Sequence, residues 1–280
     1  MDVLTRELIL SMAHLPEPEI LRIAGGSIAV FSACRPEKSG VNEDAAAVFA
    51  LPDGRGVLAV ADGLGGHSAG AEAARIAMDE LSRSLADQAG PAEPLRTALL
   101  NGIETANVRI GLLGVGAATT FAAVEIDQRA IRPYHVGDSE ILLIGQRGKV
   151  KLQTVSHSPV AYAVEAGMIS SDEAIHHADR HLVSNIVGSS DMRIEVGPGV
   201  PLASRDTLLL ATDGLFDNLY QEEIIELVRK GPLPDAARRL VELARARMDR
   251  VELDKPSKPD DLTFVLYRPD TSPSSGPGGR

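Results

Sequence analysis

Five aspartates lie at the ends of apolar segments that have the character of β-strands. They are Asp44 in NEDA, Asp62 in VADGLGGH, Asp138 in HVGDSE, Asp213 in LLLATDGLFD and Asp260 in KPDDLT. A single aspartate beside glycine at a strand end is commonly a turn residue, because its carboxylate can accept a hydrogen bond from the backbone two residues on. Five such aspartates beside strongly apolar strands are harder to explain as turns alone, and they point to a shared site.

Strand ends that meet would bring these carboxylates together. In a partly buried site such like charges repel one another by roughly several kcal/mol, and a multivalent cation removes that repulsion. Carboxylate and carbonyl oxygens suit Mg²⁺ or Mn²⁺, whereas a zinc site usually recruits cysteine or histidine. Two such ions about 4 Å apart can activate a bridging water for in-line attack on phosphorus. The aspartates therefore predict hydrolysis of a phosphate ester at a binuclear centre.

The segments that carry the aspartates, taken in order, resemble the type 2C metal-dependent protein phosphatases (the PPM family), in particular their compact bacterial members. The resemblance runs from about Ile28 to Tyr267 through NEDA, VADGLGGHSAG, ATTF, HVGDSEILLI, RHLVSNIVG, LLLATDGLFDNL and DDLTFVL. It implies hydrolysis of phosphoserine and phosphothreonine in proteins by a hydroxide that bridges two Mn²⁺ or Mg²⁺ ions. The implied partners are phosphorylated protein substrates of a bacterial-type Ser/Thr kinase.

Position by position, the resemblance assigns the core of the metal site. Asp62 would bridge the two ions, and the backbone carbonyl of Gly63 would bind one of them. Asp213 and Asp260 would supply the remaining carboxylates. The catalytic groups implied in this way are Asp62, Asp213 and Asp44.

Further acidic residues surround this core in the family. Asp44, with Glu43 beside it, matches acidic positions that hold metal-bound waters. Asp138 resembles the ligand that, together with Asp213, forms a weaker third metal site in bacterial members. Residues 156–190 correspond to a flap beside the site, which would help to select protein substrates.

The chain departs from the family where the substrate phosphate is bound. Ser39 stands where the family usually places a phosphate-binding arginine. Lys38 or Arg35 would then bind the phosphate, lysine as a point charge without arginine's bidentate fork; the alternative is that both are solvated loop cations. Leu64 replaces the histidine that eukaryotic members carry after the DG pair. His67 is a weaker candidate for that general acid, the alternative being a structural or surface role.

Three further positions differ from the family. Asp261 stands where it has asparagine, Glu140 where it has the arginine of GDSR, and Ala118 where many members have glycine. The extra carboxylate of Asp261 would raise metal affinity or disturb the water network around the ligands. Glu140 lies on the strand after Asp138, where a structural role is expected.

Three groups of residues imitate other kinds of site. They are His176, His177 and His181; Gly111, Gly114 and Gly116; and Ser156, His157 and Ser158. The histidines fall in the flap segment without a paired carboxylate or cysteine pattern. The glycines follow a helix and have the wrong spacing for a dinucleotide loop, and no nucleophile elbow surrounds the serines. We therefore assign no site to them.

The elements that must position the aspartates have the pattern of an α+β fold. Apolar or β-branched runs predict strands near 28–33, 45–51, 56–61, 117–126, 130–136, 139–145, 149–155, 206–211 and 261–267, and periodicity predicts helices over 69–88, 93–112, 221–230 and 234–250. The turns Pro52-Asp53-Gly54 and Gln146-Arg147-Gly148 suit antiparallel hairpins. This pattern favours a layered sandwich over a parallel βαβ fold. With the family resemblance, we expect a four-layer αββα sandwich of two mainly antiparallel sheets flanked by helices.

The chain divides into three parts. Residues 1–25 combine an apolar helical spacing with two helix-breaking prolines, and they predict an N-terminal extension. Residues 26–270 form the expected phosphatase catalytic domain. Residues 271–280 (TSPSSGPGGR) have no apolar side chain to bury and predict a disordered tail.

Composition and charge favour a single-domain protein and argue against nucleic-acid-binding, membrane-spanning and secreted classes. A chain of 280 residues, 44% hydrophobic, can bury one substantial core. The formal net charge of −11 argues against a broad nucleic-acid surface, which relies on lysine and arginine. The longest apolar stretches are far shorter than the roughly 20 residues of a membrane span. No secretory signal is recognisable, and the single Cys34 suits a reducing compartment. We expect a cytoplasmic protein that binds neither membranes nor nucleic acid.

Two other functions stay open. Within the superfamily, the substrate could be a small regulatory protein of a partner-switching pathway of the anti-sigma-factor type. The alternative from another class is a pseudophosphatase that binds phosphoproteins without turnover. Its mark would be missing metal aspartates, and all of them are present here.

Overall fold

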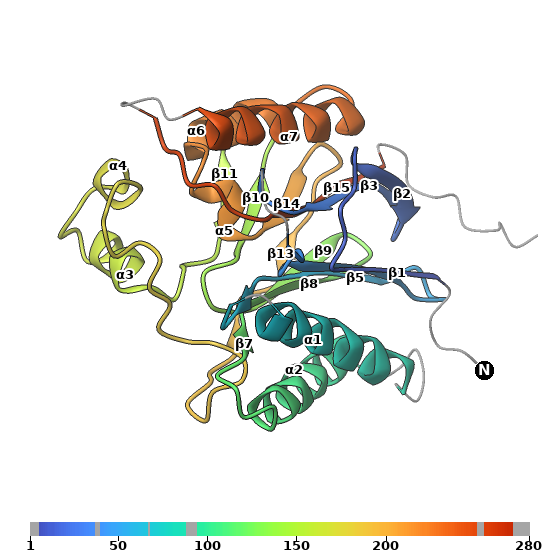
Figure 1. Ribbon diagram of the computed structural model, residues 1–280. Coiled ribbons are helices and arrows are strands. Elements are labelled where there is room, and N and C mark those ends of the chain that lie inside the picture. Colours follow the sequence, from blue (N-terminus) through green and yellow to red (C-terminus); the bar gives the residue numbers. More distant parts are fainter. Residues whose placement is uncertain (1–5, 37–39, 67, 88–93, 251–254, 271–280) are drawn as a thin grey trace, which may run out of the picture.

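The computed structural model describes residues 6–36, 40–66, 68–87, 94–250 and 255–270. Two antiparallel sheets lie face to face, and helices cover the outer face of each sheet (Figure 1). The layers are therefore helix, sheet, sheet and helix, which confirms the predicted α+β sandwich.

The first sheet has the strand order β1-β4-β5-β8-β9-β12, with β13 also paired to β9. Its strands are β1 (Arg6–Ser11), β4 (Ala45–Ala50), β5 (Gly56–Ala61), β8 (Phe121–Asp127), β9 (Ala130–Val136), β12 (Glu195–Val196) and β13 (Val200–Pro201). Helices α1 (Ser68–Ala86) and α2 (Leu95–Gly111) cover its outer face (Figure 1). The short strands β6 (Gly63–Leu64) and β7 (Ala118–Thr119) pair with each other.

The second sheet has the order β11-β10-β14-β15-β3-β2. Its strands are β2 (Glu19–Ile23), β3 (Gly26–Ala33), β10 (Glu140–Ile144), β11 (Val150–Gln153), β14 (Thr207–Ala211) and β15 (Leu262–Pro269). Helices α6 (Gln221–Val228) and α7 (Leu233–Asp249) cover its outer face, and the short α5 (Asp213–Phe216) follows β14 (Figure 1). Both predicted hairpin turns are confirmed, because β4 pairs with β5 and β10 with β11 in antiparallel register.

Three apolar layers hold the sandwich together. One lies between the first sheet and helices α1 and α2, one between the two sheets, and one between the second sheet and the helices α6 and α7. Successive side chains of a strand point to opposite faces, so a strand covered on both faces must be apolar throughout. Strand β5, with the sequence GVLAVA, is buried at every position for this reason.

The segment before Gly26 differs from its expected helical pattern. Strand β1 pairs with β4 along the edge of the first sheet, and β2 pairs with β3 along the edge of the second. Leu10 and Leu21 enter the apolar layer between the sheets. The helical interpretation is wrong because Leu8 and Leu10, two residues apart, share one face of a strand. The division of the chain at residue 25 stays a prediction.

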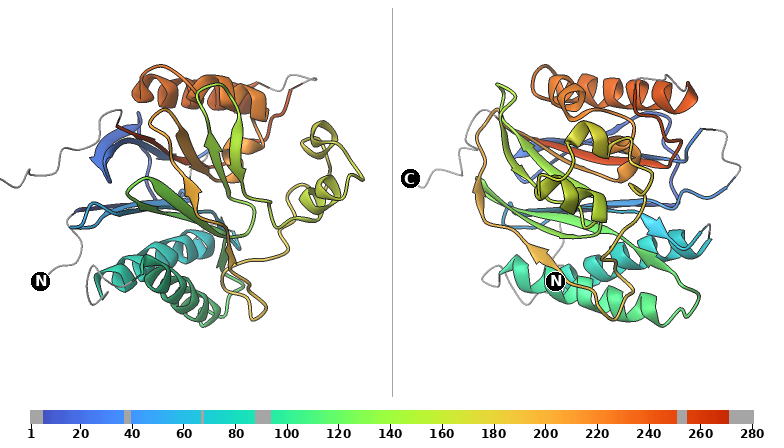
Figure 2. Two further views of the ribbon diagram at one scale, coloured as in Figure 1. Left: turned by 180° about the vertical axis from the view of Figure 1, so that it is seen from behind. Right: turned by 90° about the vertical axis from the view of Figure 1, so that its left-hand side faces the viewer.

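Residues 156–190 leave the second sheet as a flap and carry the short helices α3 (Pro159–Glu165) and α4 (Ser171–Ala174). The left view of Figure 2 shows these helices projecting beside the sandwich. Within the described ranges, no helix has the length and apolar character required to cross a bilayer. The predicted tail 271–280 lies outside the described residues.

Candidate metal centre

Four of the five aspartates line one cavity of about 240 Å³, at a point where strands of both sheets end. Residues around it include Arg35, Glu43, Asp62, Gly63, Asp138, Asp213, Lys258, Asp260 and Asp261. The fifth, Asp44, is buried next to them, where the charges of Asp213 and Asp260 act on its carboxylate. Folding therefore brings together all the aspartates that the sequence singled out.

Asp62 directly follows β5, and its backbone is held on both sides by Thr120. The Asp62 amide donates to Thr120 Oγ1 at 2.9 Å, and the Thr120 amide donates to the Asp62 carbonyl at 2.9 Å. Thr120 Oγ1 also lies 2.7 Å from the hydroxyl of Ser139, which follows Asp138. The paired threonines of ATTF thus fix the relative positions of Asp62 and Asp138.

Gly63 is a close-packed point between Asp62 and helix α1. A Cβ on Gly63 would lie 2.2 Å from the carbonyl oxygen of Gly70 and 2.6 Å from that of Glu43. The Gly63 amide donates to the same Glu43 carbonyl at 3.2 Å. Glycine is needed here because no side chain fits between these backbones.

Asp44 connects the two sheets. It precedes β4 of the first sheet, and its Oδ2 accepts a 2.9 Å hydrogen bond from Thr212 Oγ1, at the end of β14 in the second sheet. Its amide donates to Oδ1 of the buried Asn42 at 3.0 Å. Asp44 is thus hydrogen-bonded to the residue that directly precedes Asp213.

Asp213 begins α5, and Asp260 precedes β15. Two residues that lie between them in the sequence, Asp217 and Lys258, were not predicted to belong to the site. Lys258 Nζ lies 2.5 Å from Asp213 Oδ2, 2.9 Å from Asp217 Oδ2 and 3.0 Å from Asp260 Oδ2. Asp217 could have been suspected, since it lies one helical turn after Asp213. No local sequence signal marks Lys258, whose partners are up to 45 residues away.

The carboxylates repel one another. Desolvation by the surrounding protein, followed by the charges of neighbouring aspartates, raises the pKa of Asp44 and Asp62 well above the usual 3.8. The same two causes raise the pKa of Asp138 to about 8, with Asp213 as the largest charge. Desolvation and then Asp213 also raise the pKa of Asp260. Burial would lower the pKa of Lys258, but its three carboxylate partners raise it above its usual value.

These residues fit a divalent cation. Asp138 Oδ1 is buried and has no hydrogen-bond partner among the described residues. Buried oxygen atoms without donors, in a cluster whose charges oppose each other, gain both a ligand and charge neutralisation from a bound ion. The donors are carboxylate and backbone oxygens, which suits Mg²⁺ or Mn²⁺.

Asp261, where the family has asparagine, anchors two loops. Its Oδ1 accepts from the Arg35 amide at 2.9 Å and its Oδ2 from the Glu43 amide at 2.8 Å. A carboxylate can accept both bonds, whereas an amide has a single oxygen. The residue therefore fixes the loops that carry Arg35 and the NED motif.

The phosphate-binding candidates divide into two groups. Arg35 lines the cavity, and its side chain is exposed. Lys38 and Ser39 lie outside the described residues, as does His67. Leu64 lines the cavity where eukaryotic members have a histidine.

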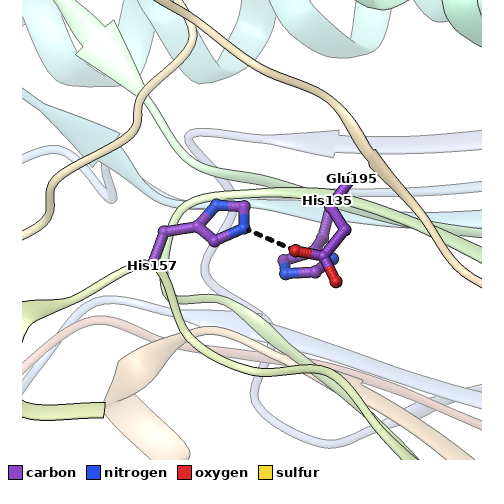
Figure 3. A group of neighbouring side chains, drawn as sticks. All are labelled: His135, His157 and Glu195. Atoms are coloured by element: carbon purple, nitrogen blue, oxygen red, sulfur yellow. Dashed lines mark hydrogen bonds and ion pairs between the residues drawn. The ribbon is translucent and has the colours of Figure 1, made fainter. Parts of the chain in front are cut away.

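A different cluster, His135, His157 and Glu195, has the composition of a metal site, but its hydrogen bonds hold the base of the flap (Figure 3). We call this cluster the clamp. His157 Nδ1 accepts from the Gly137 amide at 3.0 Å, so in the neutral ring Nε2 carries the proton and faces Glu195 Oε2 at 3.2 Å. The rings of His135 and His157 stack with centroids 4.4 Å apart and planes 21° apart. Nitrogens in nearly parallel planes do not converge on one ion.

The clamp fixes the base of the flap beside Asp138. The His157 amide donates to the Gly137 carbonyl at 2.9 Å, and the Ser184 amide donates to the His157 carbonyl at 2.8 Å. Asn185 Nδ2 lies 2.9 Å from His157 Nδ1. Both ends of the flap therefore meet at His157, next to the turn that carries Asp138.

Comparison with known proteins agrees with this geometry. A family model described as "Protein phosphatase 2C" matches residues 37–254. The chain is 33% identical to protein phosphatase PhpP of Streptococcus pneumoniae over 220 residues, covering 74% of this chain and 87% of that protein. It is 32% identical to serine/threonine phosphatase stp of Listeria monocytogenes over 197 residues, covering 67% of this chain and 77% of that protein.

Solved structures give the same result. The serine/threonine phosphatase of S. agalactiae superimposes with a TM-score of 0.76 at 28% identity, covering 87% of this chain and 99% of that chain. The catalytic domain of PstP, solved in complex with two manganese ions, superimposes with a TM-score of 0.68 at 26% identity, covering 89% and 98%. The family model spans most of the chain, and curated relatives exceed 30% identity. The chain therefore belongs to the protein phosphatase 2C family of metal-dependent serine/threonine protein phosphatases.

Proposed function

We propose that this phosphatase hydrolyses phosphoserine and phosphothreonine in protein substrates at the aspartate cluster between its two sheets, with two Mn²⁺ or Mg²⁺ ions. The observation that carries the proposal is the set of mutually repelling aspartates that line one cavity, among them Asp62, Asp213 and Asp260. The partner-switching and pseudophosphatase alternatives are not favoured by the relatives, which are named as serine/threonine phosphatases.

Each residue of the cluster has a proposed task. Asp62, Asp213, Asp260 and the Gly63 carbonyl hold the two ions, while Asp44 orients water at the centre. When bound, the ions lower the pKa of water and neutralise charge that develops on the phosphoryl oxygens. Thr120 keeps Asp62 in place through its two backbone hydrogen bonds.

The substrate phosphate needs a cation at the rim, and Arg35 supports this role by its position. Arg35 is exposed and lines the cavity, while its backbone amide donates to Asp261. A guanidinium can bind two phosphate oxygens at once. Lys38, the other candidate, keeps its proposed role as an additional point charge.

A second cavity of about 430 Å³ supports a protein substrate. It lies between the flap helices α3 and α4 and the helices α5 and α6, and Asp138 and Asp213 line both cavities. A phosphorylated side chain that reaches the metal centre would leave its neighbouring residues in this larger cavity. We further propose that the substrates come from a Ser/Thr kinase and that the protein works in the cytoplasm, as its single cysteine suggests.

Hydrolysis of phosphoserine and phosphothreonine peptides tests the proposal. Phosphate release should require Mn²⁺ or Mg²⁺, stop with EDTA and return when Mn²⁺ is added back, because oxygen ligands bind these ions reversibly. Asp62→Asn is the matched inactive control. Full activity of metal-stripped protein would overturn the binuclear mechanism. Faster hydrolysis of a phosphorylated regulator domain than of all peptides would favour the partner-switching substrate instead.

A further inference from the structure

Lys258 places a positive charge inside the acidic cluster. Its ammonium group lies within 3.0 Å of carboxylate oxygens of Asp213, Asp217 and Asp260. Asp217 is not among the proposed ligands of the two ions, so it can hold Lys258 whether or not they are bound. Asp213 uses Oδ2 for Lys258, which leaves Oδ1 for an ion.

The backbone around Lys258 is built to keep the side chain there. The Lys258 amide donates to Asn218 Oδ1 at 2.8 Å, and Asn218 Nδ2 donates to the Lys258 carbonyl at 2.8 Å. Asn218 is fully buried and also donates to the Gly214 carbonyl at 2.9 Å. A Cβ on Gly214 would lie 1.9 Å from the Asp261 carbonyl oxygen, so the backbone of α5 packs against that of Asp261, three positions after Lys258.

We infer that Lys258 is a resident cation that takes the place of a third divalent ion, so that this phosphatase binds two ions where Asp138 and Asp213 would otherwise hold a third. This inference rests on the proposed binuclear function. An ion shared by Asp138 and Asp213 would lie beside the ammonium group, and like charges repel strongly in a partly buried site. The lysine also partly neutralises Asp213 and Asp217, which removes part of the attraction for another ion.

Counting bound Mn²⁺ by mass spectrometry after equilibrium dialysis tests the inference without an activity assay. Wild type should saturate at two ions per chain, and Asp138→Asn should also hold two. Lys258→Met, which keeps most of the unbranched side chain but removes the charged end, should hold three. The double variant Lys258→Met with Asp138→Asn should return to two. Lys149→Met, a change at an exposed lysine, should hold two like wild type.

The number of bound ions distinguishes a failure of this inference from a failure of the proposed function. Three ions in wild type, falling to two in Asp138→Asn, would overturn the inference while leaving the proposed function intact, and this comparison does not depend on whether the lysine variant folds. A folded Lys258→Met variant that still holds two ions would also overturn it. Fewer than two ions in wild type would instead overturn the binuclear function itself. Thermal unfolding gives a second readout. Without metal, Lys258→Met should have a lower Tm than wild type. Added Mn²⁺ should raise the Tm of Lys258→Met by more than it raises the Tm of wild type.

Discussion

Asp213 lies where most of the interactions of the candidate metal centre meet. It follows β14, begins α5 and accepts a hydrogen bond from Lys258 at 2.5 Å. Its charge contributes to the raised pKa of four other residues, Asp44, Asp62, Asp138 and Asp260. A change at this one position should therefore affect both metal binding and the stability of the metal-free protein.

Asp213→Asn keeps the shape of the side chain and removes one negative charge. Turnover should fall at least about 100-fold, because metal activation supplies several kcal/mol of transition-state stabilisation. The metal-free variant should be as stable as wild type or more so. Four carboxylates lose a repelling neighbour, while Lys258 keeps its ion pairs with Asp217 and Asp260. The paired measurement is metal-dependent turnover and metal-free thermal unfolding. Near-normal turnover with a lowered Tm would show that Asp213 is merely a turn residue.

His135 should make the stability depend on pH. Burial, followed by the nearby His157, lowers the pKa of His135 below the usual 6.5. As the pH falls below about 6.5, His135 binds a proton in the unfolded chain but stays neutral in the folded protein. This difference in proton binding favours unfolding at acidic pH. His135→Gln cannot titrate and keeps a donor for the Val155 carbonyl, which His135 Nε2 reaches at 3.0 Å. Its Tm should fall less than that of wild type between about pH 7.5 and about pH 5.5.

The matched control for His135 is the exposed His14. His14→Gln should lose as much Tm as wild type over the same pH interval. If His135→Gln behaves like this control, the buried histidine does not contribute to acid sensitivity.

At the scale of elements, the sequence patterns predicted the positions of the strands well but did not predict which residues make contact at the strand ends. The runs at 45–51 and 56–61 and the turn between them became β4 and β5 because a continuous apolar run and turn chemistry are both local properties of the sequence. The predicted run 117–126 is divided into β7 and β8 at Thr120, whose backbone bonds to Asp62 instead. The aspartates were found because each lies beside a recognisable strand.

Contacts between distant segments could not be predicted in the same way. Lys258 reaches Asp213 across 45 positions of sequence, and His157 closes the flap on Gly137 and Ser184. Neither contact follows from composition or periodicity, because both depend on how loops pack after the sheets have formed. The same is true of Asp261, whose two backbone partners lie more than 200 positions away.

Gly63→Ala should weaken the junction between β6 and α1. The added Cβ would meet two backbone oxygens at 2.2 and 2.6 Å, which cannot move as a flexible side chain can. We expect a loss of about 1–3 kcal/mol in the free energy of unfolding and weaker Mn²⁺ binding. Chemical denaturation and metal titration measure the two effects.

Gly111→Ala is the matched control for this junction. Its nearest neighbour would be the Gly188 carbonyl oxygen at 3.5 Å, an ordinary contact at the end of helix α2. Alanine favours a helix over glycine by up to about 1 kcal/mol, so stability should stay equal or rise. Equal losses in both variants would show that the close packing at Gly63 is unimportant.

For the molecule as a whole, the N-terminal segment completes both sheets. Strand β1 closes the edge of the first sheet beside β4, and β2 closes the edge of the second beside β3. Leu21 is 8% exposed and packs between the sheets, whereas the adjacent Ile20 is 45% exposed. These strands should contribute to global stability.

Leu21→Ala should lower the free energy of unfolding by about 2 kcal/mol or more, because it removes apolar contacts and leaves a cavity in the inner layer. Ile20→Ala, one position away on the same strand, should cost less than about 1 kcal/mol. Urea denaturation of both variants compares them. Equal, negligible losses would support the view of residues 1–25 as an extension outside the folded unit.

Strand β15 follows every other described element in the sequence, yet it lies in the middle of the second sheet between β14 and β3. Asp260 and Asp261 come directly before it. A ribosome releases a chain from its N-terminus, so β3 and β14 lack their shared neighbour until residues 262–269 have been made. A chain that ends before β15 would therefore lack both a complete second sheet and Asp260, one of the proposed metal ligands. We therefore expect no phosphatase activity from a nascent chain until β15 has joined the second sheet.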